Sequence, residues 1–204
     1  MKFFLLLFLF VCSAGFSQSK EKLFKQDFAV LVEEMELMYR YDKLLRNYAS
    51  LKTTGGRENE LPENLLDSLG LPELPKLDFG DGDLRNHIYN NYIYPKDAEH
   101  TKRMISITKK YGFPTIKRIR QYTDKEFSEP DFNPFFLLQY APQKYWKKLK
   151  KLMKKEYRAG RINQCDYGFL LWHFSLDKSF KPMLDNGYVM ETRDGVPFLK
   201  PTCE

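Results

Sequence analysis

The chain has 204 residues, of which 43% are hydrophobic and 16% are aromatic. This composition excludes an intrinsically disordered protein, since disordered chains are poor in both classes, and the length suits one domain with a sizeable core. The formal net charge is +6, from 33 basic and 27 acidic residues. An excess of this size is common in soluble proteins and does not by itself require a polyanionic partner.

Residues 1–17 have the pattern of a secretory signal peptide. One lysine precedes an apolar run that is too short to span a bilayer, and small residues follow, ending at Ser17. We expect cleavage after Ser17 and export to the periplasm or out of the cell. No later stretch is apolar enough to span a membrane, so we expect no transmembrane segment in the mature chain.

Residues 18–52 are predicted to form a long amphipathic helix. Neither Gly nor Pro interrupts the segment from Lys20 to Tyr48, and its apolar residues recur at steps of four and three. These residues are Phe24, Phe28, Leu31, Met35, Met38, Tyr41, Leu45 and Tyr48. A coiled-coil dimer is the alternative, but the aromatic members of the stripe favour the edge of a globular core.

Residues 53–94 are predicted to be an irregular acidic and aromatic connection, because Gly and Pro punctuate them. Asp78, Asp81 and Asp83 lie close together, as in calcium loops, but their spacing departs from the EF-hand pattern, and turn chemistry explains them more simply. The run at residues 86–95, rich in Tyr and Asn, fits either a short helix or an irregular segment.

Residues 95–204 are predicted to form a helical core. A helix should end at Gly112, and a corner at Phe113-Pro114 should lead into a second short helix. Asn133 should cap a short apolar segment. The next helix should run from Pro142, which suits a first turn, to Gly160, which suits the residue after a helix end.

The helix from Pro142 to Gly160 carries apolar residues along one side and lysines along the other. The basic surface is represented by Lys147, Lys150, Lys151 and Lys154. Three interpretations stay open: a solvated face, an anionic membrane surface or polymer, and nucleic acid. Nucleic acid is disfavoured, because almost no Arg or exposed aromatic residue is interleaved with the lysines.

The segment from Cys165 to Phe174 is the most apolar part of the mature chain, and we interpret it as a central core helix with Asn163 as its N-cap; a strand is the alternative. Two short extended runs follow, joined at an Asp-Gly turn, which predicts a β-hairpin. The expected fold is therefore mainly α, a single multi-helix domain with a small C-terminal hairpin.

Two cysteines, Cys165 and Cys203, remain once Cys12 leaves with the signal peptide. An even number in an oxidising compartment is compatible with a disulfide. Two unpaired thiols are the alternative.

The chain has three histidines, His87, His100 and His173, and none has a zinc-binding spacing. Nucleophile and phosphate-loop motifs are absent, so no metal and no cofactor is expected. His173 beside Trp172 needs a hydrogen-bond partner on an apolar helix, and Gln139 and Tyr140 could supply one. These four residues are the candidate binding residues, and a satisfied core histidine is the alternative.

Several short motifs between residues 95 and 201 resemble a widespread bacterial domain of unknown function found in exported proteins. They are Tyr111-Gly112-Phe113-Pro114-Thr115, Leu137-Leu138-Gln139-Tyr140-Ala141, a basic helix that ends at a glycine, Asp166-Tyr167-Gly168 at the start of an apolar helix, and a closing hairpin. The family commonly has His in place of Tyr140, Asp-Arg in place of Trp172-His173, and Tyr-Gly-Thr-Gln near Tyr188. The resemblance implies the fold and export but no activity.

These observations predict a non-catalytic envelope or secreted protein that binds another molecule, with an anionic surface or a protein as its partner. The alternative is a hydrolase-like enzyme with a pocket near Gln139, Tyr140 and His173.

Overall fold

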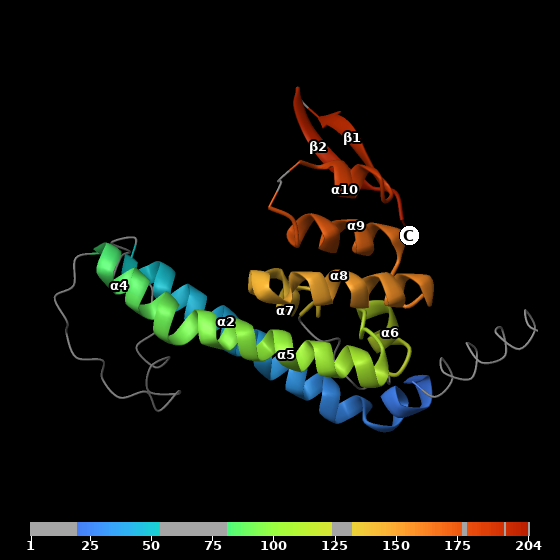
Figure 1. The fold of residues 1–204 in the computed structure, drawn as a ribbon, viewed down its shortest axis with the longest axis horizontal. Helices are drawn as coiled ribbons and strands as arrows, with labels where there is room; N and C mark the ends of the chain where they lie inside the picture. The colour runs from blue at the N-terminus through green and yellow to red at the C-terminus, as the bar shows by residue number, and fades with distance from the viewer. Residues whose placement is uncertain (1–19, 54–80, 124–131, 177–178, 194, 204) are drawn as a thin grey trace, which may run out of the picture. The chain divides into compact units, whose positions relative to one another are not determined.

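The computed structural model describes residues 20–53, 81–123, 132–176, 179–193 and 195–203 (Figure 1). It is mainly helical with one small antiparallel sheet at the C-terminal end, which confirms the predicted fold class. The expected signal peptide and Asp78 lie outside the described residues. Within the described ranges, no helix combines the length and the apolar character that a membrane span requires.

The chain forms two compact units. The smaller unit is Arg40–Asp97, and the larger unit contains the residues before Arg40 together with those from Ala98 onward. Helices α2 (Phe28–Thr53) and α5 (Tyr94–Tyr111) contribute residues to both.

The predicted N-terminal helix is interrupted at Asp27, because residues 20–26 are helical, Asp27 is a turn, and α2 begins at Phe28. The Tyr111 hydroxyl donates a hydrogen bond of 2.6 Å to the Asp27 carboxylate at this break. The first part of the predicted stripe packs into the core of the larger unit through buried residues that include Phe24 and Met35. Leu45 and Tyr48 pack against the apolar cluster of the smaller unit. Tyr41 departs from the prediction, because its side chain is exposed.

The irregular connection predicted for residues 53–94 is wrong from Asp81 onward, where α4 (Asp81–Ile88) and the π-helix η1 (Tyr89–Ile93) lead into α5. For the run at residues 86–95, the helical one of the two open interpretations is the one present. Ile88 and Ile93 bury their side chains in a small core with Ala49 of α2, which gives the smaller unit its own apolar cluster. Pro95 has no N–H to donate to the turn before it, which favours a local departure from the α-helical pattern there.

The corner after α5 follows the prediction. Gly112 adopts a φ of 80° after the last residue of α5. α6 (Ile116–Arg120) follows, and the Thr115 side chain accepts a hydrogen bond from the Arg118 N–H. The predicted apolar segment contains α7 (Phe136–Gln139), and Asn133 accepts a hydrogen bond from the backbone N–H of Phe135.

Helices α8 (Gln143–Arg158), α9 (Gln164–His173) and α10 (Lys181–Leu184) lie in successive layers of the larger unit (Figure 1). The helix at Cys165–Phe174 is confirmed, and the strand alternative is wrong. The expectation of a central core helix is also wrong, because within α9 only Cys165, Gly168 and Leu170 are buried. α9 contacts both α8 and α10, and most of its other residues are partly buried.

The C-terminal hairpin consists of β1 (Tyr188–Arg193) and β2 (Val196–Pro201), paired from Arg193 opposite Val196 to Tyr188 opposite Pro201. A disulfide joins Cys165 of α9 to Cys203 just after β2. The disulfide and the predicted hairpin are therefore both present. The disulfide links the C-terminal end of the hairpin to α9.

Candidate binding surface on helix α8

Helix α8 is anchored to the core by its apolar side, as predicted. Leu149, Leu152 and Met153 are buried. At the start of the helix, the indole N–H of Trp146 donates a hydrogen bond of 2.7 Å to the carbonyl oxygen of Ala141. Pro142 is the N-cap and Gly160 has a φ of 68° after the end, so both predicted boundaries hold.

The outer side of α8 concentrates the positive charge of the chain. The helix contains eight basic residues and one acidic residue, a net charge of +7, whereas the whole chain has a net charge of +6. At about 100° per residue, all but one of these cations fall within an arc of about 120°. We call the exposed basic residues of α8 the basic face: Lys144, Lys147, Lys148, Lys150, Lys151, Lys154, Lys155 and Arg158. The four predicted lysines all belong to it.

The lysines of the basic face from Lys147 to Lys155 make no ion pair with any acidic residue that the structure describes. Exposed lysines elsewhere do, as Lys200 does with Glu191 at 2.9 Å and Lys181 does with Asp185 at 3.0 Å. Like charges at helical neighbour positions repel by a few tenths of a kcal/mol per pair. The helix therefore tolerates a repulsion that an anionic partner would relieve.

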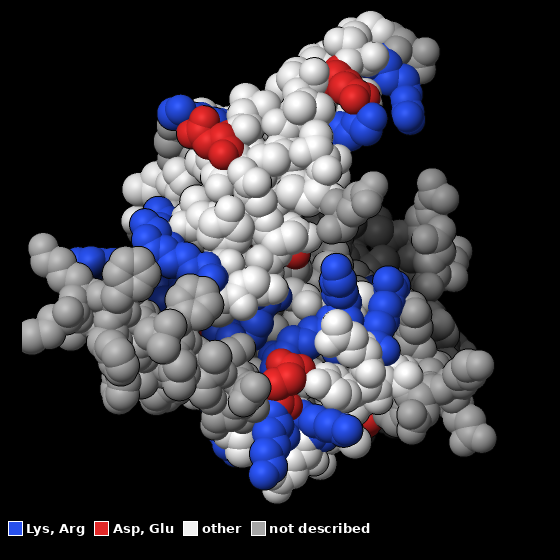
Figure 2. Space-filling model, turned by 90° about the vertical axis from the view of Figure 1, so that its right-hand side faces the viewer, with Lys and Arg blue, Asp and Glu red and all other residues white. Residues whose placement is uncertain are grey.

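In Figure 2 the molecule is seen along the axis of α8, with the C-terminal end of that helix toward the reader. Basic side chains dominate the surface of the helical part on this side, whereas the hairpin at the top carries both signs (Figure 2). On the face drawn in Figure 2, the charged side chains of the helical part are therefore mainly basic.

Glu156, the one acidic residue of α8, faces inward and fixes the end of the helix. Its carboxylate is 1% exposed and accepts hydrogen bonds from the Phe113 backbone N–H at 2.9 Å and from the Arg161 guanidinium at 2.5 and 3.0 Å. The Lys20 ammonium lies 3.5 Å away. Burial raises the pKa of Glu156, but the bonds from Arg161 and Phe113 outweigh it and hold the pKa below its ordinary value.

Gly112 allows two guanidinium groups to approach the corner after α5. A Cβ at this position would lie 2.6 Å from Cδ of Arg161 and 3.2 Å from Nη1 of Arg118. Arg118 is 5% exposed, lies 3.9 Å from the ring centre of Phe24, and pairs with Glu21 at 2.8 Å. The tyrosine-glycine-aromatic-proline motif therefore packs against the ion-paired side chains of Arg118 and Arg161. Its glycine has a structural role, because it leaves room for them.

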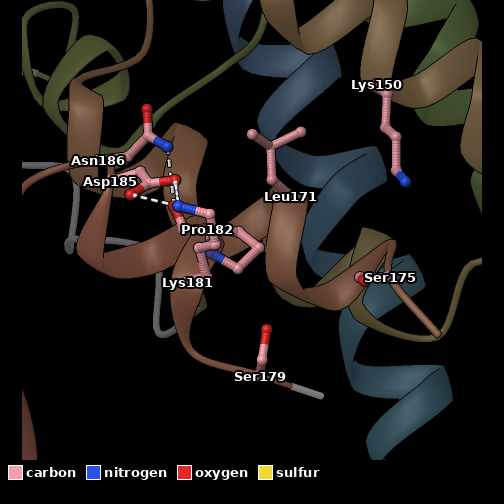
Figure 3. A pocket seen from close by; sticks show the side chains of 8 residues that line it. All are labelled: Lys150, Leu171, Ser175, Ser179, Lys181, Pro182, Asp185 and Asn186. Carbon is pink, nitrogen blue, oxygen red and sulfur yellow. Dashed lines mark hydrogen bonds and ion pairs between the residues drawn. The ribbon is translucent and has the colours of Figure 1, made fainter. Parts of the chain in front are cut away.

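An open depression of about 350 Å³ lies between α8, the end of α9 and α10 (Figure 3). Its lining includes Lys150, Leu171, Ser175 and Lys181. In Figure 3, Lys181 points toward Asp185, and Lys150 stands apart from both. The depression thus adjoins the basic face through Lys150.

The four predicted binding residues do not line this depression. Trp172 and His173 belong to an aromatic cluster on α9: the ring of His173 lies 4.4 Å from that of Phe169, and the ring of Trp172 lies 6.2 Å from that of Phe180. Gln139 is the last residue of α7, and the Tyr140 side chain is 45% exposed. The hydrolase-like pocket near Gln139, Tyr140 and His173 stays a prediction.

Glu156 and Arg118 are not among the residues predicted from the sequence. Glu156 was detectable, because it follows Leu149, Leu152 and Met153 at helical steps and so falls on the apolar stripe. Nothing in the sequence distinguishes Arg118 from its neighbours Lys117 and Arg120.

Within the described part of the chain, no group of three or more His, Cys, Asp or Glu side chains has the arrangement of a metal site. Comparison with protein-family models, with curated proteins and with solved structures finds no match to this chain. The resemblance to an exported bacterial domain of unknown function therefore stays a prediction.

Proposed function

We propose that this chain is an exported, non-catalytic binding protein that holds an anionic surface against the basic face of α8. The observation that carries the proposal is the row of exposed lysines on α8 without acidic partners among the described residues, on a helix whose net charge exceeds that of the whole chain. The rest of the chain is close to neutral, so the attraction would be local and oriented.

The partner we propose is an anionic membrane surface. The helix has 16 residues, which corresponds to a length of about 24 Å, so it can span several lipid headgroups. Its apolar side is occupied by the core, which argues for adsorption by charge alone and against insertion of the helix. Lysine ammonium groups act as point charges, and diffuse attraction needs no bidentate geometry.

The test compares two variants with the same change in net charge. In the first, Lys147, Lys150, Lys151 and Lys154 are replaced by Gln. In the control, four exposed lysines of other helices are replaced by Gln: Lys22, Lys25, Lys102 and Lys117. Retention on vesicles that contain an anionic lipid is measured as a function of salt, with neutral vesicles as the reference.

We expect salt-sensitive retention of the unmodified chain and of the control. At about 1 kcal/mol for each basic residue near an anionic surface, the α8 variant should lose about three orders of magnitude in affinity. Equal retention of both variants would contradict the proposal. A parallel measurement on immobilised heparin separates the sources of negative charge, because retention on heparin without retention on vesicles would replace the membrane by a polyanion.

A further inference from the structure

The two outer edges of the C-terminal hairpin differ in the backbone groups they present. Thr202 N–H donates a hydrogen bond of 2.8 Å to the carbonyl oxygen of Gly187, the pair next to Tyr188 and Pro201. In an antiparallel ladder, hydrogen-bonded pairs alternate with pairs whose N–H and C=O groups point outward. The register therefore turns the backbone groups of Tyr188, Met190 and Thr192 of β1 away from β2.

The same alternation turns Pro197, Leu199 and Pro201 of β2 outward. Proline has no N–H, so two of these three positions offer no donor to a further strand. The outer edge of β2 is thus closed to pairing, whereas each of the three outward positions of β1 has both a donor and an acceptor. Met190 is 48% exposed, and the Thr192 side chain is also exposed.

We propose that β1 pairs antiparallel with β1 of a second copy of this chain, which joins the two hairpins into one four-stranded sheet. The outward groups are symmetric about Met190, so a two-fold axis at this residue matches every donor with an acceptor. Met190 then lies opposite Met190 of the second copy, and Tyr188 lies opposite its Thr192. An aromatic residue opposite a β-branched one is a favourable cross-strand pair.

The charges of β1 do not oppose this pairing. Glu191 forms an ion pair with Lys200 at 2.9 Å within its own hairpin, and Arg193 lies 5.5 Å from the ring centre of Phe198. The pairing also covers exposed apolar side chains of the strand, Val189 at 41% and Met190 at 48%. A two-stranded hairpin is only marginally stable by itself, and a wider sheet stabilises it.

The test uses matched proline substitutions on the two edges. Met190→Pro removes an outward N–H from β1, and Leu199→Pro removes the outward N–H of its partner residue on β2. Neither removes a donor from the bonds between the two strands. We expect sedimentation equilibrium to show a dimer of the full chain in the micromolar range, a monomer for Met190→Pro and a dimer for Leu199→Pro. Circular dichroism and the intact Cys165–Cys203 disulfide check that both variants fold.

A monomeric full chain at all concentrations would overturn the proposal, as would loss of the dimer in both variants or in neither. Cysteine cross-linking tests the register independently of proline. Met190→Cys should form a covalent dimer on mild oxidation, because residues opposite each other on the two-fold axis lie within reach of a disulfide. Val189→Cys should not, because its counterpart is displaced along the strand. Equal cross-linking of the two variants would also overturn the proposal.

Discussion

Two buried carboxylates, Glu156 in the larger unit and Asp97 in the smaller, differ in the sign of their pKa shifts although each is bonded to an arginine. Glu156 is 1% exposed and receives the Arg161 guanidinium and the Phe113 N–H, with Lys20 nearby. Its pKa lies below the ordinary value despite burial.

Asp97 is 6% exposed and shares the Arg46 guanidinium with Asp42, which is 3.0 Å from Arg46. Burial and the Asp42 carboxylate raise the pKa of Asp97 from 3.8 to about 6, against the opposing effect of Arg46. Burial is the largest influence on both groups and raises both pKa values. At Glu156 the bonds from Arg161 and Phe113 outweigh burial, whereas at Asp97 the Arg46 guanidinium, which Asp42 also binds, does not.

The largest expected effect on stability comes from removing the Glu156 carboxylate. Glu156→Gln leaves the Arg161 guanidinium and the Lys20 ammonium without their carboxylate. Removing one partner of a buried ion pair costs several kcal/mol, so we expect the free energy of unfolding to fall by about 3 kcal/mol. Urea denaturation measures the loss.

The matched control is Glu191→Gln, which breaks the exposed pair with Lys200. Exposed pairs contribute less than about 1 kcal/mol, so this variant should stay close to the unmodified chain. Similar losses for the two substitutions would show that the buried ion pairs of Glu156 contribute no more to the free energy of unfolding than an exposed pair does.

The second prediction concerns the pH dependence of Asp97. Between pH 3.8 and about 6 the folded state retains a proton that the unfolded chain has released, so the free energy of unfolding should fall as pH rises through this range. The integrated change is at most about 3 kcal/mol. Asp97→Asn, which cannot titrate, should reduce this fall in denaturation experiments repeated at several pH values, and the remainder comes from Asp166, whose pKa burial also raises.

Glu156 acts in the opposite direction. Because its folded-state pKa is lowered, the stability it contributes is present above its ordinary value and is lost as pH falls through the folded-state pKa. Asp97→Asn should therefore leave the loss of stability at more acidic pH in place. Loss of both effects in this single variant would show that the two carboxylates do not titrate independently.

The smallest expected effect concerns the glycine beside the Glu156 network. Gly112→Ala and Gly195→Ala place an alanine at the same φ of 80°, so they share the backbone strain. A Cβ at Gly112 meets Arg161 at 2.6 Å, whereas nothing lies within 4 Å at Gly195. We expect Gly112→Ala to lower the free energy of unfolding by about 2 kcal/mol and Gly195→Ala by about half of that. Equal losses in thermal or urea denaturation would assign the whole cost to the backbone.

Local patterns in the sequence were enough to predict α8 and its surroundings. The steps between Leu149, Leu152 and Met153 define its buried side, and Pro142 and Gly160 define its ends. The hairpin followed from its turn residues in the same way. These features depend on neighbours a few residues apart, and periodicity and turn chemistry report such neighbours directly.

Features that depend on distant residues were not predictable. The helices α4 and η1 form where the sequence indicated an irregular connection, because Ile88 and Ile93 find a partner in Ala49 of α2. Two of the partners of Glu156 come from distant segments, at Lys20 and Phe113. No spacing rule connects residues so far apart.

The sequence by itself therefore determined the mainly helical fold class, the basic face of α8 and the position of the hairpin. Each of these depends on residues that are close together in the sequence. The tertiary structure alone decided which charges are neutralised. It brought the Lys20 ammonium and the Phe113 N–H to the Glu156 carboxylate and left the lysines on the outside of α8 without acidic partners among the described residues. Charge pairing depends on distances across the fold, and those distances exist only once the chain has packed.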